Sequence, residues 1–67
     1  MKEYLSTYEI MAELGISKST VQRTRDKMRK LIGKKGGLST RAIIGQGKAI
    51  RMRYVDFLTA MGTRVVR

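Results

Sequence analysis

A glycine-centred break between two amphipathic segments is the feature that most constrains the fold of this 67-residue chain. Apolar residues recur at helical spacing up to Leu14, Gly15 interrupts them, and Ser17 is suited to begin a second helix. Glycine tolerates the left-handed backbone that ends many helices, and serine is a favoured N-cap. Only Ile16 stands between these two residues, so we expect two helices that cross at a steep angle with Ile16 in the corner.

The limits of the two helices follow from local sequence. Ser6 and Glu9 have the spacing of a capping box, which predicts a first helix over about residues 7–14. Residues 18–32 contain no glycine or proline and have apolar residues at helical spacing, which predicts a strongly basic second helix there. Together the segments have the pattern of a helix-turn-helix. An ordinary helical hairpin without a ligand is the alternative.

The second helix is the one expected to read DNA. Val21 packs it back onto the first helix, which leaves the opposite face protruding, and a protruding helix fits the major groove. Arginine can donate two hydrogen bonds to guanine, and glutamine can pair in a similar way with adenine. The alternatives are a solvated helix face, capping or packing for the threonine, and a surface ion pair for the aspartate. The residues predicted to face DNA here are Lys18, Ser19, Thr20, Gln22, Arg23, Asp26 and Lys27.

The charge of the chain also favours a polyanionic partner. Fifteen Lys and Arg stand against five Asp and Glu, for a net charge of +10. Residues 1–17 have a net charge of −2, so residues 18–67 have an excess of +12. Such an excess in a small domain is unfavourable self-repulsion unless a polyanion relieves it, and nucleic acid is the usual polyanion. Duplex DNA is the partner that the helix-turn-helix pattern favours over RNA, and a generic basic surface for solubility is the alternative.

The second half of the chain is predicted to form a wing and a short third helix. Residues 33–37 are a flexible, glycine-rich connector. Two β-friendly runs at residues 41–44 and 48–52 flank Gly45-Gln46-Gly47, which suits a hairpin. Helical spacing returns at residues 53–61, before a short strand or loose tail at 63–67. The fold class is therefore mainly α with a small β-hairpin. It is a single winged helix-turn-helix domain over residues 1–67, in the order helix, helix, hairpin wing, short helix.

Basic and polar residues surround the predicted wing and its connector. Arginine inserts readily into narrow minor grooves, and connector lysines contact phosphates without reading sequence. Charges that only keep an edge hairpin from aggregating are the alternative. The residues predicted to contact DNA from these segments are Lys34, Lys35, Arg41, Gln46, Lys48, Arg51 and Arg53.

The order of these elements resembles a known family. A helix-turn-helix, a basic hairpin and then Ala-Ile-Arg-Met-Arg-Tyr-Val-Asp-Phe-Leu at residues 49–58 are similar to the small winged domains of phage and transposon excisionases and their MerR-type relatives. This resemblance implies an architectural factor of a phage or mobile element that bends DNA and sets the direction of site-specific recombination. It also implies an integrase or recombinase as a partner. The linking segment at residues 34–40 is longer and richer in glycine than in the compact members of that family.

Other functions stay open at this point. A phage or plasmid transcriptional regulator would use the same domain. The DNA-recognition part of a packaging terminase small subunit would need a further assembly domain. One recognition helix reads only a few base pairs, so several copies are expected to act together on DNA. We expect a monomer in solution that binds cooperatively to tandem direct repeats.

An enzyme is not expected from this composition. The chain has no His and no Cys, and its acidic residues are scattered, so we expect no catalytic residues, no metal site and no cofactor. No apolar run approaches the ~20 residues that span a membrane, and the first residues do not resemble a signal peptide. A membrane-active cationic helix would need Trp or Phe anchors, and the chain has one Phe and no Trp. A cytoplasmic, nucleoid-associated protein is the expectation.

Overall fold

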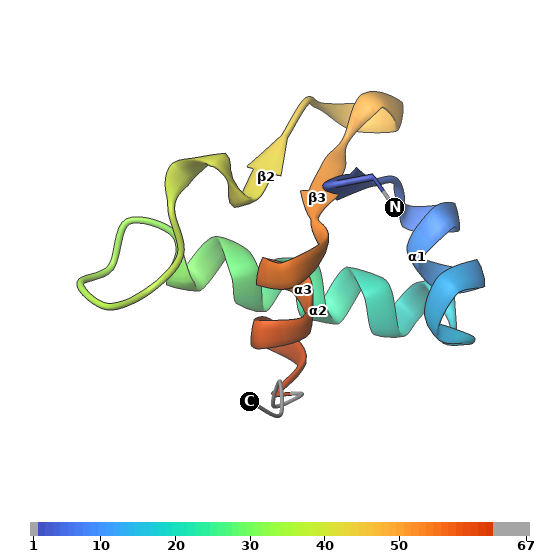
Figure 1. The fold of residues 1–67 in the computed structure, drawn as a ribbon, viewed down its shortest axis with the longest axis horizontal. Helices are drawn as coiled ribbons and strands as arrows, with labels where there is room; N and C mark the ends of the chain where they lie inside the picture. The colour runs from blue at the N-terminus through green and yellow to red at the C-terminus, as the bar shows by residue number, and fades with distance from the viewer. Residues whose placement is uncertain (1, 63–67) are drawn as a thin grey trace.

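The structure, a computed structural model that describes residues 2–62, contains three α-helices and a three-stranded antiparallel sheet (Figure 1). None of the helices in this part of the chain is long and apolar enough to cross a membrane. The predicted tail at residues 63–67 lies outside the described residues. In chain order the elements are β1 (Tyr4–Leu5), α1 (Thr7–Leu14), α2 (Lys18–Leu31), the 3-10 helix η1 (Thr40–Ala42), β2 (Ile43–Ile44), the 3-10 helix η2 (Gly47–Ala49), β3 (Arg51–Arg53) and α3 (Tyr54–Met61).

Local hydrogen bonds begin and end the first two helices where the sequence predicted. The Ser6 side chain accepts from the Glu9 amide at 3.2 Å, and the Glu9 carboxylate accepts from the Ser6 amide at 2.9 Å, which completes the capping box. Gly15 ends α1 in the left-handed conformation, with φ 65°. Ser17 begins α2 as its N-cap, since its hydroxyl accepts from the Thr20 amide. The helix-turn-helix and its register are confirmed.

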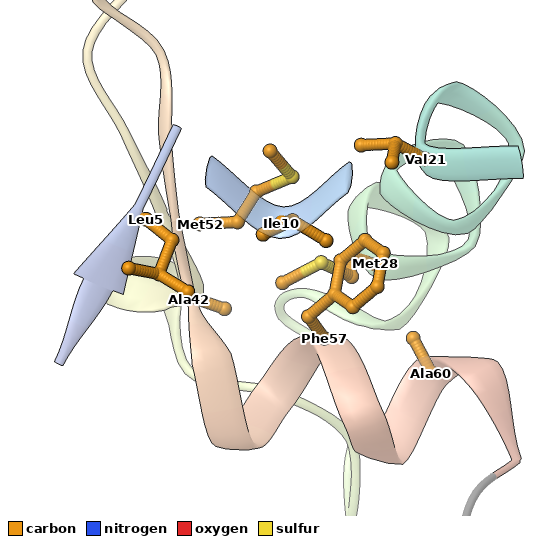
Figure 2. Packing of buried hydrophobic residues seen from close by; sticks show 8 residues of the cluster. All are labelled: Leu5, Ile10, Val21, Met28, Ala42, Met52, Phe57 and Ala60. Atoms are coloured by element: carbon orange, nitrogen blue, oxygen red, sulfur yellow. The ribbon is translucent and has the colours of Figure 1, made fainter. Parts of the chain in front are cut away.

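A core of buried apolar side chains joins the three helices to the sheet. Val21 and Met28 of α2 point toward Phe57 of α3 and Ile10 of α1, and all four side chains are fully buried (Figure 2). The predicted packing of Val21 is therefore confirmed. The remaining members of the cluster are Leu5, Ala42, Met52 and Ala60. Because α2 packs against both α1 and α3, its opposite face is the one that residues 2–62 leave open to a partner.

The sheet contains a strand that the sequence did not predict. Its order is β1-β3-β2, so β3 is the central strand, with Tyr4 opposite Arg53 on one side and Ile43 opposite Met52 on the other. The Tyr54 amide also donates to the Glu3 carbonyl at 2.9 Å. The N-terminal segment thus holds the base of the wing, and β3 continues directly into α3.

The wing is a shorter hairpin with a longer loop than predicted. Residues 41 and 42 lie in η1 and residues 48 and 49 in η2, so the pairing of β2 with β3 is limited to four residues. The loop between these strands covers residues 45–50, and we call it the wing loop. Gly45 has φ 80°, and a Cβ there would collide with the Ala49 carbonyl oxygen, because the chain turns back tightly at this point.

The predicted flexible connector is a closed loop that starts and finishes against the end of α2. The Leu31 carbonyl accepts from the amides of Lys34 (3.3 Å) and Leu38 (3.0 Å), and the Gly33 amide donates to the Leu38 carbonyl. A Cβ on Gly37 would collide with the Leu31 carbonyl oxygen. These contacts make residues 33–37 a projection at the C-terminal end of α2 (Figure 1). The glycine content of the segment alone does not predict them. We call this segment the connector loop.

Candidate nucleic-acid interface

The outer face of α2 presents most of the side chains predicted to face DNA. Val21, Thr24 and Met28 are buried on the inner face, where the Thr24 hydroxyl donates to the Thr20 carbonyl at 2.9 Å. At ~1.5 Å per residue the 14 residues of α2 extend about 21 Å. The exposed predicted residues are Lys18, Ser19, Gln22, Arg23, Asp26 and Lys27, whereas Thr20 is half-buried.

The hydroxyl groups at the start of α2 belong to its cap. The Ser17 Oγ lies 3.1 Å from the Ser19 Oγ and 3.0 Å from the Thr20 Oγ1. Ser17 also accepts from the Thr20 amide. Capping was the alternative role considered for Thr20, and the structure shows that role. Ser19 and Thr20 are therefore part of the cap. The exposed side chains near the start of α2 that take no part in it are those of Lys18 and Gln22.

The charges of α2 are not neutralised within the described part of the chain. The helix has six Lys and Arg side chains and one acidic side chain, Asp26. The ion pairs found in residues 2–62 involve only Lys2 and Arg53 as cations, so the surface pair considered for Asp26 and Arg23 is not formed. The sequence did not single out Arg29 and Lys30 as contact residues. Both are exposed in the last turn of α2, where cations also interact favourably with the helix dipole.

A groove of about 500 Å³ lies beside this face, between the start of α1, the first half of α2 and the wing loop. The structure thus brings Lys18 and Gln22 of the recognition helix together with Lys48 of the wing. Its lining also includes Tyr8 and Arg25, which sequence reasoning missed. The spacing of residues 18, 22 and 25 could have placed Arg25 on the same helix face.

Tyr8 is exposed to 66%, and the Lys18 ammonium lies 5.7 Å from the centroid of its ring. A cation at this distance from an aromatic face is attracted by the ring quadrupole. This contact connects the first turn of α1 to the first turn of α2 at the mouth of the groove. No sequence signal pointed to it.

Most of the other predicted contact residues lie away from this groove. Lys34 and Lys35 are exposed on the connector loop, at the opposite end of α2 (Figure 1). Arg41 is exposed in η1, where its carbonyl accepts from the Tyr4 hydroxyl at 2.9 Å. Gln46 is exposed in the wing loop. Predicted basic contact residues therefore lie at both ends of the recognition helix, and not around the wing alone.

The two arginines of β3 are engaged with the protein itself. Arg51 Nη1 donates to the Ile50 carbonyl at 2.9 Å. Arg53 Nε lies 2.9 Å from a Glu3 carboxylate oxygen, as an ion pair without hydrogen-bond alignment, and Nη1 lies 4.0 Å from Asp56. The pair with Glu3 joins the residue before β1 to the end of β3. Both arginines are half-buried, so they are less available to DNA than the exposed Lys48.

One acidic residue near the groove, Glu9, is held by the start of α1. The Ser6 backbone amide, helped by the Lys2 ammonium at 3.0 Å, lowers the pKa of Glu9 from 4.5 to about 2. Glu9 is thus held as a carboxylate that caps α1. Within residues 2–62 no group of three His, Cys, Asp or Glu side chains is placed to hold a metal ion.

Comparison with known proteins agrees with this geometry. Residues 1–58 match the Mga helix-turn-helix domain, which covers α1, α2, the wing and the first part of α3. Neither the comparison with curated proteins nor the comparison with solved structures gave a match. The match extends over most of the chain and supports the DNA-binding part of the expectation drawn from sequence. The chain belongs to the Mga helix-turn-helix domain family, and it binds DNA through its helix-turn-helix.

Proposed function

We propose that the protein binds double-stranded DNA sequence-specifically, with α2 in the major groove. One observation carries this proposal: Gln22 and Arg23 are exposed on the outer face of α2, and no carboxylate of the described residues pairs with Arg23. Amide and guanidinium groups on a protruding helix match the hydrogen-bonding edges of adenine and guanine. The buried Val21 fixes the rotation of the helix, so these two side chains point away from the core.

Two pairs of substitutions test this assignment. Gln22→Ala and Arg23→Ala should each weaken binding to the cognate site by about 1–3 kcal/mol and weaken binding to random DNA much less, because base contacts are lost. Lys34→Ala and Lys35→Ala, on the connector loop, should weaken both kinds of DNA alike, because phosphate contacts carry no sequence information. Fluorescence anisotropy with a selected site and a scrambled duplex measures the affinity of each variant for the two kinds of DNA, and the ratio of these affinities shows whether discrimination is lost. Equal losses on both duplexes for Gln22→Ala and Arg23→Ala would contradict base reading.

The salt dependence of binding provides an independent measurement. Neutralisation of about five to eight phosphates should give a slope of roughly −4 to −7 when log K is plotted against log salt concentration. This number of phosphates is consistent with basic residues at both ends of α2, which is about 21 Å long. A slope near zero, or tighter binding to RNA than to duplex DNA, would refute the assignment.

For the cellular role we propose an architectural factor of excisionase type, which bends DNA and acts beside an integrase or recombinase. What supports this role is a single recognition helix with exposed lysines near both its ends, Lys48 on the wing loop and Lys34 and Lys35 on the connector loop, since such lysines can engage the DNA backbone on both sides of the bases that α2 reads. Copies would bind cooperatively to tandem direct repeats. Sedimentation at micromolar concentration should show the monomer mass, and gel shifts with permuted sites should show a bend. A stable dimer on a palindromic, unbent site would instead indicate a transcriptional regulator.

A further inference from the structure

The groove beside α2 is lined by cations from two separate elements. Lys18 and Arg25 come from α2, and Lys48 comes from the wing loop. Among the described residues, none that lines the groove is acidic. Lys18, Gln22 and Arg25 recur at helical spacing and so share one side of α2, while Lys48 faces them from across the groove. Three positive charges therefore line one concave site.

These cations lack the partners that would explain them as parts of the fold. Within residues 2–62 no carboxylate lies within ion-pair distance of Lys18, Arg25 or Lys48. The Nε of the half-buried Arg25 is covered from solvent and has no hydrogen-bond acceptor there. The Nε of Arg53, which is also half-buried, has no aligned hydrogen bond either, but the Arg53 guanidinium lies within 4.0 Å of two carboxylates, whereas that of Arg25 lies near none within residues 2–62. Uncompensated cations on a concave surface attract anions, because the walls focus the electric field.

We propose that this groove is a phosphate-ester site, and that in the DNA complex it binds a backbone phosphodiester of the strand beside α2. The inference rests on the proposed function and extends it. A guanidinium matches phosphate geometry with two parallel hydrogen bonds, which here would come from the two terminal Nη groups of Arg25 because its Nε is covered from solvent. The ammonium groups of Lys18 and Lys48 add charge from both walls. Tyr8 and Ile50 supply the apolar surface against which the adjoining sugar packs. The wing loop then clamps the strand at the edge of the major groove instead of entering the minor groove.

Inorganic phosphate without DNA tests the site directly. Amide NMR spectra are recorded during a phosphate titration at constant ionic strength, set with chloride. We expect saturable shifts confined to residues around the groove, and roughly tenfold weaker phosphate binding in Arg25→Gln and in Lys48→Gln. Lys30→Gln, a matched charge loss on α2 outside the groove, should bind phosphate like the wild type. Equal weakening in all three variants would overturn the site, because it would show only diffuse attraction.

Duplex DNA distinguishes the two sources of phosphate. If the groove holds a backbone phosphodiester, Arg25→Gln and Lys48→Gln should each reduce the magnitude of the salt slope by about 0.9 and leave the ratio of cognate to random affinity unchanged. Unchanged slopes in variants that no longer bind phosphate would overturn the DNA assignment, because the site would then serve a free phosphate ester. Lys48 lies in an exposed loop, so its variant gives a result even if Arg25→Gln fails to fold. Localised phosphate binding without any duplex binding would refute the proposed function and not the site.

Discussion

Replacing Gly15 with alanine isolates the conformational requirement of the turn between α1 and α2. Gly15 has φ 65° and ψ 35°, in the left-handed region. A Cβ added there has no atom within 4 Å, so the substitution causes no collision. The whole effect therefore comes from the backbone, where an L-residue in this conformation costs about 1–2 kcal/mol.

The size of the expected change is large for a domain of this length. At about 0.05–0.15 kcal/mol per residue, the total free energy of unfolding is on the order of 3–10 kcal/mol. A domain this small loses about 4–8 °C in Tm for each kcal/mol, so Gly15→Ala should lower Tm by roughly 4–16 °C. Thermal unfolding followed by circular dichroism measures this shift. The contact face is unaltered, so DNA affinity well below Tm should stay within about twofold of the wild type.

Gly15→Asn is the matched control, because asparagine adopts the left-handed conformation more readily than alanine does. It should recover a good part of the lost Tm. If Gly15→Ala melts within about 1 °C of the wild type, the turn is not left-handed, and the register of the helix-turn-helix given above is wrong. A loss of DNA affinity with no change in Tm would show instead that Gly15 approaches the DNA.

Three further substitutions test the core, the cap and the wing loop. Val21→Asp places a carboxylate at a fully buried position and should cost about 4 kcal/mol or more, seen as loss of the cooperative unfolding transition; a native-like melt would contradict the orientation of α2. Because the Ser6 amide and Lys2 lower the pKa of Glu9 to about 2, its contribution is fully present above pH 4.5 and is lost as the pH falls toward 2. The Tm difference between Glu9→Gln and the wild type should therefore shrink from pH 7 to pH 2, and a constant difference would count against the capping role. Gly45→Ala combines a positive φ with a collision at the Ala49 carbonyl, so it should disturb amide NMR signals of the wing loop and weaken cognate and random DNA alike. An unchanged affinity would show that the loop does not touch DNA.

The first two helices were predictable because neighbouring residues encode the start of each and the turn between them. Ser6 and Glu9 cap the start of α1, Gly15 ends α1 and Ser17 caps the start of α2, and these caps are present in the structure. The buried stripe of α2 also followed from helical spacing, with Val21 fully buried. The outward-facing residues of the candidate site could be named for the same reason.

The sheet and the groove depend on contacts between distant parts of the chain, and the connector loop depends on backbone hydrogen bonds that composition does not reveal. Strand β1 has two residues and no periodic pattern, and it forms because β3 offers an unpaired edge. The ion pair of Arg53 with Glu3 follows from that pairing, so sequence reasoning had no basis for removing Arg53 from the wing surface. The closed connector loop depends on the Leu31 carbonyl, which a count of glycines does not reveal. The groove likewise requires Tyr8 and Lys48 to meet across the fold.

The direct continuation of β3 into α3 has a mechanical consequence. Both edges of β3 are paired, and α3 follows β3 without a linking residue and packs on the recognition helix, so the base of the wing is held in place relative to α2. A duplex that touches both elements must adapt its own shape to the protein. Sites with compliant pyrimidine–purine steps between the two contact regions should therefore be preferred at base pairs that no side chain reaches. Stiffness of the DNA, rather than adaptation of the protein, would then rank the binding sites.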